Sequence, residues 1–169
     1  LGGASTEITL VRNRHITKSV SLPIGALTLT GTYQKGDEYT PKELDKLTKV
    51  VKKTIKEHAW LRNVKLPLLG IGGTARNIAK MDQRKLSYPI TKLHNYEIPH
   101  HRFHEILEEV KGKSLEERKK ISGLSSERAD IIIAGLTIVE ELFNYVNTKT
   151  LVVGGCGLRE GLFYDYYGA

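Results

Sequence analysis

Leu1-Gly2-Gly3-Ala4-Ser5-Thr6-Glu7 is the stretch around which this 169-residue chain is organised. Two glycines allow a sharp turn and let bare backbone N–H groups approach an anion closely. Ser5 and Thr6 add hydroxyl donors and Glu7 adds a carboxylate, a combination that suits phosphoryl chemistry. The alternative, which a lone Gly-Gly would favour, is an ordinary glycine turn between two strands.

The residues after this loop predict a β-hairpin. Glu7–Val11 alternates polar and apolar residues, the chain turns at residues 12–14, and His15–Leu22 continues as a second strand. Residues 22–25 break that strand, and Ala26–Thr32 predicts a short helix or turn. We therefore expect the opening loop to stand at the head of a hairpin.

Two capping boxes predict helix starts, at Thr40–Glu43 and at Ser114–Glu117. One face of the first helix is apolar and carries Leu44, Leu47, Val51, Ile55 and His58. The opposite face carries Lys42, Lys46, Lys49, Lys53 and Lys56. Such a stripe could track a polyanion, but surface helices normally carry charge on their outer face, so we favour a solvated face.

Two buried strands are predicted to end in glycine-rich turns. Leu66–Ile71 is a continuous apolar run, typical of a strand buried on both faces, and Gly72-Gly73-Thr74 leads from it into a helix. Thr150–Val153 predicts the last strand, which residues 154–157 join to a terminal helix, Leu158–Tyr166. Since ligands of open α/β sheets bind at the carboxyl ends of strands, we expect all three glycine turns to converge at one edge as an anion site.

The middle of the chain predicts helices over His100–Val110 and over Glu127–Val146, the second capped by Ser126. Arg128 and Asp130 fall in the first turns of that second helix, where a structural ion pair is favoured over a ligand site. The element order predicts one α/β domain over residues 1–169, with a mixed sheet covered by helices on both faces.

Histidines and a cysteine offer further candidates that we weigh lower. His100 and His104 have metal-ligand spacing, with His94 and His101 nearby, but no third convergent ligand accompanies them. A surface helix with exposed imidazoles is therefore favoured. The single cysteine, Cys156, lacks an obvious histidine partner, and we interpret it as a small packed residue.

Composition bounds the class of protein. With 40% hydrophobic and 27% charged residues, the chain is ordinary for a soluble globular domain. No apolar run approaches the roughly 20 residues of a membrane span, no signal peptide is visible, and one cysteine fits a reducing cytoplasm. The net charge of +7 favours an anionic partner, but aromatic residues do not interleave with basic ones, so nucleic-acid binding rests on charge alone.

Taken together, these motifs resemble the exopolyphosphatase / guanosine pentaphosphate phosphohydrolase family. The matching stretches occur in the family's order, nearly end to end: Leu1–Glu7, Ser21–Ala26, Gly70–Arg76, Arg128–Ile132 and Gly157–Gly161. The resemblance implies the actin / heat-shock chaperone / sugar kinase superfamily, whose catalytic unit has two ribonuclease H-like subdomains beside a cleft. It implies here the second subdomain only, a mixed five-stranded sheet with a truncated first strand and no N-terminal subdomain. Ala4 replaces the third glycine of the family loop, which is tolerated if its φ is negative.

The same resemblance implies roles for individual residues. Contacts to the terminal phosphates are implied for Gly2, Gly3, Ser5, Thr6, Gly72, Gly73 and Thr74, with Arg128 and Arg159 as weaker candidates. Glu7 is the implied catalytic residue, which helps bind Mg²⁺ or orients the hydrolytic water. A divalent cation is expected because the phosphate charge must be neutralised as the phosphoryl group transfers.

The leading hypothesis is a parent phosphohydrolase that removes terminal phosphate from inorganic polyphosphate or guanosine pentaphosphate. We expect the isolated 169 residues to bind phosphate without catalysis, because the partner subdomain is missing. The alternatives are a non-catalytic phosphate- or nucleotide-binding module and a nucleotide-dependent kinase or ATPase of the same superfamily. Substrate preference and oligomeric state, a homodimer included, are left open.

Overall fold

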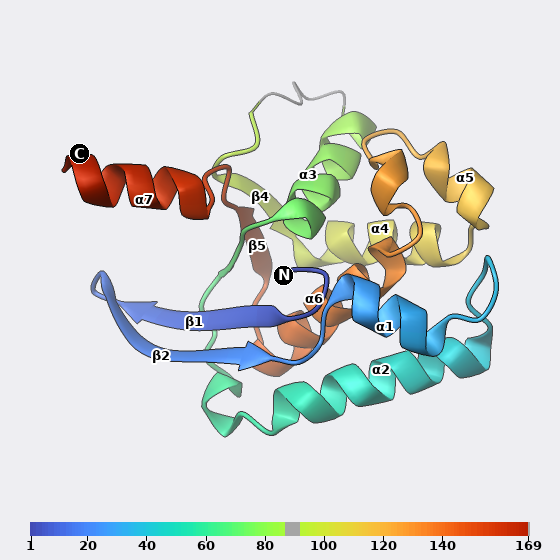
Figure 1. Ribbon diagram of the computed structural model, residues 1–169, viewed down its shortest axis with the longest axis horizontal. Helices are drawn as coiled ribbons and strands as arrows, with labels where there is room; N and C mark the ends of the chain where they lie inside the picture. The colour runs from blue at the N-terminus through green and yellow to red at the C-terminus, as the bar shows by residue number, and fades with distance from the viewer. Residues whose placement is uncertain (87–91, 169) are drawn as a thin grey trace.

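The opening hairpin forms as its alternating pattern predicts. In the computed structural model, which describes residues 1–86 and 92–168, β1 (Thr6–Arg12) pairs antiparallel with β2 (His15–Leu22). Asn13 and Arg14 form the connecting turn with positive φ angles of 51° and 65°, the backbone that two-residue hairpin turns require. Figure 1 shows the hairpin extending away from the helices.

Helix α2 (Pro41–Lys56) begins at the predicted capping box. The Oγ1 of Thr40 accepts a hydrogen bond from the N–H of Glu43 at 3.3 Å, and Glu43 Oε2 accepts one from the N–H of Thr40 at 2.8 Å. The apolar face is buried as predicted, and its fully buried residues are Leu47, Val51 and Ile55. Helix α1 (Ala26–Tyr33) precedes it, and the 3₁₀ turn η1 (Ala59–Leu61) follows.

The remaining strands form a separate mixed sheet. Strand β5 (Thr150–Val153) lies in its centre, parallel to β3 (Leu68–Gly70) and antiparallel to β4 (Tyr96–Pro99). The α/β class is confirmed, but the five strands of the described residues are divided between two sheets, β1-β2 and β3-β5-β4. Analysis of the sequence missed β4, because it has only four residues and the last of them is a proline, which is rare inside a sheet.

Strand β3 differs from the prediction of a strand buried on both faces. It lies at the edge of its sheet, and Leu69 is 62% exposed. Burial alternates along β5, where Leu151 and Val153 are buried and Val152 is only half-buried. Helices therefore cover one face of this sheet, and the face with Leu69 stays open, contrary to the expectation of cover on both faces.

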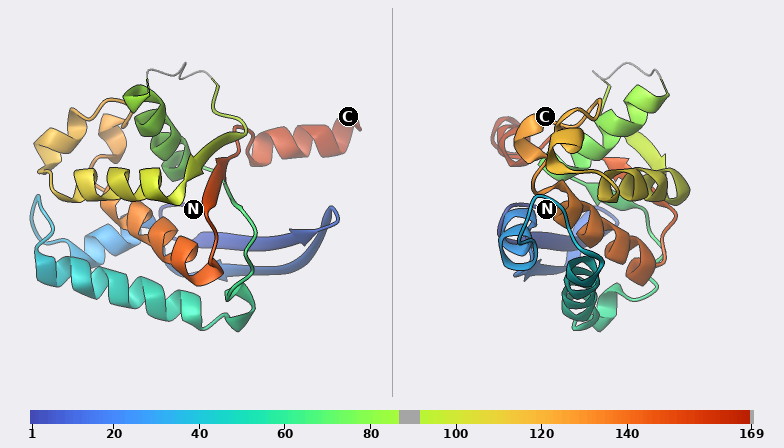
Figure 2. Two further views of the ribbon diagram at one scale, coloured as in Figure 1. Left: turned by 180° about the vertical axis from the view of Figure 1, so that it is seen from behind. Right: turned by 90° about the vertical axis from the view of Figure 1, so that its right-hand side faces the viewer.

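Helix α6 (Ile132–Val146) is the centre of the core and packs against α1, α2 and α4 (His100–Lys111), an arrangement that Figure 2 shows from two sides. The prediction of one helix from Glu127 with Ser126 as its cap is wrong. Residues 126–128 form a 3₁₀ turn, η2 (Ser126–Arg128), and the α-helix begins only at Ile132. The Oδ1 of Asp130 accepts a hydrogen bond from the N–H of Ile131 at 2.8 Å, the local bonding by which Asp competes with a helix.

Three further helices complete the described structure. Helix α3 (Gly73–Lys85) follows β3, and the short α5 (Leu115–Lys119) starts at its predicted capping box. Helix α7 (Leu158–Tyr167) forms as predicted but projects from the body, with no residue buried (Figure 1). Among the described residues, no helix has the length and apolar composition needed to cross a membrane.

Candidate phosphate-binding site

The three glycine-rich turns meet at one edge of the fold, as predicted. The N–H of Gly154, after β5, donates to the carbonyl of Gly70 at 2.9 Å. The amino group of Leu1 lies 3.5 Å from the carbonyl oxygen of Ile71. A Cβ at Gly72 would stand 3.1 Å from the carbonyl oxygen of Leu1. The opening loop, the turn after β3 and the turn after β5 are therefore direct neighbours.

The opening loop turns its carbonyl groups toward α1. The N–H groups of Ala26 and Leu27 donate to the carbonyls of Gly2 and Gly3 at 3.0 and 2.9 Å. In a trans peptide the N–H points opposite to the C=O, so the N–H groups of Gly3 and Ala4 face away from α1. Within the described residues, these two N–H groups have no hydrogen-bond acceptor. The loop thus presents free donors of the kind that bind anions.

The φ of Ala4 is not positive, so the alanine is accommodated at the position of the family's third glycine. Gly25, which analysis of the sequence did not single out, is essential to the loop geometry. A Cβ at Gly25 would overlap the backbone of Gly3 and Ala4. The signal that could have found it is the Pro23-Ile24-Gly25 break just before α1.

Glu7 lies at the start of β1 with its carboxylate exposed. Its Oε1 accepts hydrogen bonds from Ser5 Oγ at 2.5 Å and from Ser21 Oγ at 3.1 Å. The bond from Ser5 is the main cause that lowers the pKa of Glu7 below its ordinary value of 4.5. Glu7 therefore stays ionised at neutral pH, and Ser5 orients it.

Two predicted hydroxyl donors are buried instead. Thr6 is 3% exposed, and its Oγ1 donates to the carbonyl of Ile24 at 2.6 Å. Thr74 is also 3% exposed, and its Cγ2 would lie 2.9 Å from a Cβ at Gly135 of α6. Both side chains are therefore buried between elements and not exposed at the turns.

The turn after β3 leads directly into α3. Gly72 has a φ of 110°, in the region that favours glycine. Gly73 is the first helical residue, so the N–H groups of the first turn have no partner within the helix and carry its positive dipole end. The backbone is thus suited to an anion at this point.

Arg128 is brought to this helix end from η2. A Cβ at Gly73 would overlap the guanidinium group, so the side chain of Arg128 lies across the glycine. The expected ion pair with Asp130 is absent from the described residues, where no carboxylate pairs with Arg128. The guanidinium is therefore a free cation beside free N–H groups.

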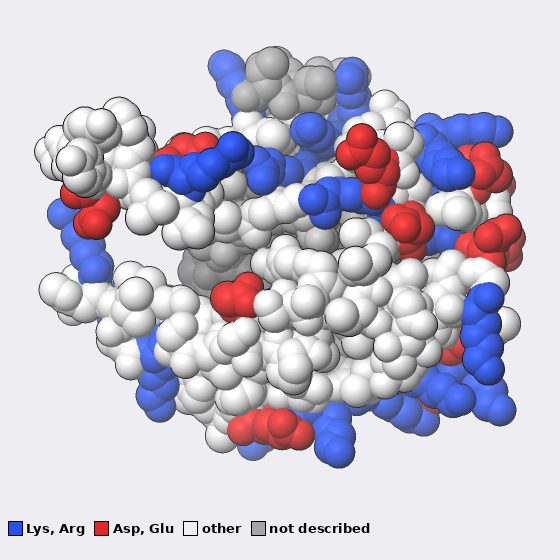
Figure 3. All heavy atoms as spheres, in the orientation of Figure 1, with Lys and Arg blue, Asp and Glu red and all other residues white. Residues whose placement is uncertain are grey.

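Arg159 lies in the first turn of α7, exposed, and no contact joins its side chain to the glycine turns among the described residues. Its neighbour Glu160 accepts a hydrogen bond from the N–H of Gly157 at 2.7 Å, which is the main cause that lowers the pKa of Glu160. Arg76, in the first turn of α3, lowers that pKa further by its charge and is a basic residue that analysis of the sequence missed. Figure 3 shows basic side chains over the starts of α3 and α7, beside a hollow between α7 and the hairpin.

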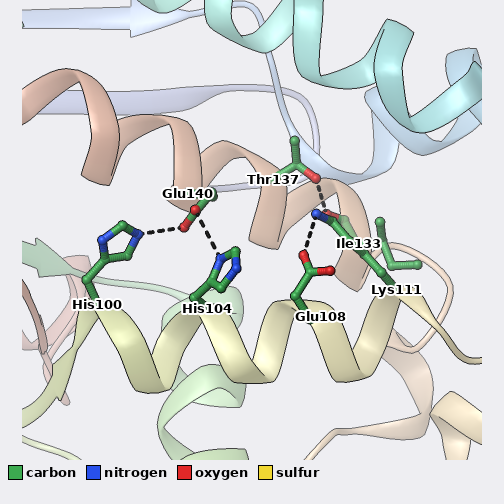
Figure 4. Close-up of polar contacts among 7 residues, drawn as sticks. All are labelled: His100, His104, Glu108, Lys111, Ile133, Thr137 and Glu140. Atoms are coloured by element: carbon green, nitrogen blue, oxygen red, sulfur yellow. Dashed lines mark hydrogen bonds and ion pairs between the residues drawn. The ribbon is translucent and has the colours of Figure 1, made fainter. Parts of the chain in front are cut away.

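The histidines do not assemble a metal centre. His100 Nε2 lies 2.9 Å from Glu140 Oε2, and His104 Nδ1 lies 3.3 Å from Glu140 Oε1, so both side chains join α4 to α6 (Figure 4). In residues 1–86 and 92–168 no three His, Cys, Asp or Glu side chains are grouped so as to hold a metal. His94 instead supports a glycine turn, because its Nδ1 accepts from the N–H of Gly155 at 3.2 Å. Cys156 is exposed, so its prediction as a packed residue is wrong.

The assembled turns match a known family along the whole chain. The model of the Ppx/GppA phosphatase family matches residues 1–168. The chain belongs to this family. Among curated relatives, the Fusobacterium nucleatum bifunctional 3-dehydroquinate synthase/phosphatase is 27% identical over 156 residues, 90% of this chain and 23% of that protein. Exopolyphosphatase 2 of Mycobacterium tuberculosis is 29% identical over 146 residues, 84% of this chain and 45% of that protein.

Solved structures support the same assignment. The Aquifex aeolicus member of the Ppx/GppA family superposes with a TM-score of 0.87 at 27% identity, covering 98% of this chain and 54% of that one. A Cytophaga hutchinsonii exopolyphosphatase, 20% identical, shares the fold with a TM-score of 0.87 and is 56% covered. The fold is thus that of the family's domains, and the chain spans about half the length of these solved relatives.

Glu7 fits Mg²⁺, the metal that the family resemblance implies, as a single ligand. Mg²⁺ typically takes one or two carboxylates together with waters and substrate phosphates. Both hydrogen bonds to the Glu7 side chain reach Oε1, which leaves Oε2 without a partner among the described residues. The other ligands would have to come from phosphate oxygens, water or the remainder of a longer protein.

Proposed function

We propose that the longer protein to which this chain corresponds hydrolyses the terminal phosphate of inorganic polyphosphate or guanosine pentaphosphate. This chain would supply the phosphate-binding wall of the site. The observation that carries the proposal is the convergence of free donors at one edge: the N–H groups of Gly3 and Ala4, the first turn of α3, and the guanidinium of Arg128. The printed names of relatives, a phosphatase and an exopolyphosphatase, support the same chemistry.

The residues divide the work in the proposed reaction. The backbone N–H groups of Gly3 and Ala4, with those of the first turn of α3, hold the phosphoryl oxygens and stabilise the charge that spreads over them during transfer. Arg128 adds a charge-assisted contact to a non-bridging oxygen. Glu7, oriented by Ser5, positions the attacking water. Mg²⁺, when bound beside Glu7, would neutralise part of the negative charge of the phosphate.

A second subdomain is proposed to form the opposite wall. The relatives extend well beyond the length of this chain, and α7 presents apolar side chains with nothing packed on them in the described structure. Such exposed apolar surface marks an interaction site. The 169-residue chain by itself would then bind phosphate but not hydrolyse it. A purely binding role is the second candidate, favoured because no three His, Cys, Asp or Glu side chains of the described residues are grouped so as to hold a metal.

The test is phosphate release from long-chain polyphosphate and from guanosine pentaphosphate with Mg²⁺. This chain is compared with a version extended at its N-terminus to the length of the family's solved members. We expect release by the extended protein only. No release by the extended protein from either substrate contradicts the proposed activity, and release by the 169-residue chain alone contradicts the need for a second wall.

A further inference from the structure

Two buried polar side chains hold the backbone on both sides of Arg128. Arg118, in α5, is 0% exposed. Its Nη1 donates to the carbonyl of Ala129 at 2.8 Å and lies 3.4 Å from the carbonyl of Asp130. Its Nη2 donates to the carbonyl of Asp37 at 2.6 Å. The two residues that follow Arg128 are thereby tied to α5 and to the loop before α2.

Asn77 makes the connection on the other side. Its Nδ2 donates to the carbonyl of Gly73 at 2.8 Å, and its Oδ1 accepts from the N–H of Ser125 at 2.7 Å. One buried side chain thus joins the glycine of the phosphate turn to the start of the segment that carries Arg128. The segment 125–130 is held at its beginning and its end, and Arg128 lies between.

A buried guanidinium without a carboxylate partner costs stability, so packing alone does not explain why Arg118 occupies this position. No carboxylate pairs with it among the described residues, and burial lowers the pKa of its guanidinium. Its Nε is buried without an acceptor. Taking a guanidinium out of water costs free energy unless hydrogen bonds compensate for the lost hydration. What the guanidinium adds is a fixed direction for three carbonyl groups, two of them next to Arg128.

We propose that Arg118 is a positioning residue of the phosphate site, which acts by holding Ala129 and Asp130 so that the Arg128 guanidinium lies across Gly73. The inference rests on the proposed function, because Arg128 must bind phosphate for its position to matter. It makes no contact with the ligand itself. A loose Arg128 would have to be ordered when the anion binds, which weakens binding.

The test is a double-mutant cycle for tripolyphosphate binding to the 169-residue chain, measured by calorimetry at low salt, with thermal unfolding recorded for each variant. The variants are Arg128→Gln, Arg118→Met and the two combined. The matched control is Arg102→Met. Arg102 also pairs with a buried group, Asp82 at 3.0 Å, and donates to the carbonyl of Glu97 at 3.1 Å, but it lies on α4.

We expect Arg128→Gln to weaken affinity by about tenfold or more, the loss typical of a hydrogen bond to a charged group. Arg118→Met should cause a similar loss in the wild-type background and a further loss of no more than about twofold in the Arg128→Gln background. Arg102→Met should lower the unfolding temperature and leave affinity within about twofold. If Arg118→Met does not fold, Arg118→Lys replaces it, because lysine keeps the charge but can bond to fewer carbonyl groups. We expect the same two results: a similar loss of affinity in the wild-type background and a further loss of no more than about twofold in the Arg128→Gln background.

Wild-type affinity in the Arg118 variant overturns the positioning role, and so does an equal loss in both backgrounds. A loss in Arg102→Met as large as that in Arg118→Met would also overturn it, because general loosening would then explain the effect. Failure of the proposed function looks different: the wild-type chain does not bind tripolyphosphate, or Arg128→Gln binds as tightly as wild type. In that case the positioning role falls with it.

Discussion

At the scale of single residues, Glu7 is a position where a substitution should change activity but not the stability of the fold. Within the described part of the chain its side chain bonds only to Ser5 and Ser21, both near the surface, so its removal should disturb the fold little. In the extended protein, Glu7→Gln should lower kcat for polyphosphate by at least about 100-fold, the usual scale for a group that handles the reacting proton or water. The measurement is steady-state kinetics beside a thermal unfolding curve; an unchanged kcat would remove Glu7 from the reaction.

Gly25 tests the support of the opening loop. Gly25→Ala should lower the unfolding free energy by about 1–3 kcal/mol, because its methyl group would enter the backbone of Gly3 and Ala4. Displacing that loop should also weaken tripolyphosphate binding. The control is Gly31→Ala in α1, where the added Cβ meets no atom within 4 Å outside the local helix backbone and the helix gains about 0.5–1 kcal/mol. Denaturant unfolding with equal losses in both variants would contradict this account.

At the scale of elements, α6 carries a buried carboxylate, Glu141, that lowers the stability of the fold when it is ionised. Glu141 is 7% exposed, and burial is the main cause that raises its pKa above 4.5. The folded state therefore binds this proton more tightly than the unfolded state, a contribution present below pH 4.5 and lost as the pH rises through the folded pKa. Glu141→Gln should raise the unfolding temperature at pH 7, and the gain should shrink as the pH falls through the folded pKa of Glu141 and be lost below 4.5.

The control for that pH series is Glu105→Gln on α4, whose side chain is exposed. It should leave the unfolding temperature unchanged across the series. A gain for Glu141→Gln that is the same at pH 4 and pH 7 would show that charge burial is not its cause.

The elements that could be predicted from the sequence are those whose signals are local. The hairpin, the two capping boxes and the helix after Gly72-Gly73 depend on residues within a few positions of each other. The start of α6 depends on Asp130 bonding its neighbour and on Arg118 from another helix, so the choice of Ser126 as its cap placed the start too early. Strand β4 forms only because β5 offers it an edge.

In the candidate site, too, only part of the arrangement could be predicted from the sequence. That the glycine turns meet follows from strand order and could be predicted. The direction of a side chain could not: Thr6 bonds to Ile24, and Thr74 packs on Gly135, 61 positions later in the chain. Arg128 was expected to pair with Asp130 but lies across Gly73, a residue of another helix.

At the scale of the whole molecule, α7 is an apolar helix without a partner in the described structure. Leu162 is 60% exposed, and Phe163, Tyr166 and Tyr167 are exposed beside it. Leu162→Asp should therefore leave the unfolding temperature of the 169-residue chain unchanged to within about 2 °C. In the extended protein the same substitution should destabilise, by about 2 kcal/mol or more, because a buried charge would replace a packed side chain. Equal, small effects in both proteins would show that the second subdomain does not cover α7.

The central claim is that the opening loop, the turn into α3 and Arg128 together bind phosphate. Its most direct test is a titration of the ¹⁵N-labelled 169-residue chain with tripolyphosphate at low salt, followed by backbone amide chemical shifts. The account predicts that the largest shifts fall on residues 2–5, 72–75 and around Arg128, and that they weaken in Arg128→Gln. Shifts that instead follow the lysines of α2, or that are spread evenly over the basic surface, would contradict it.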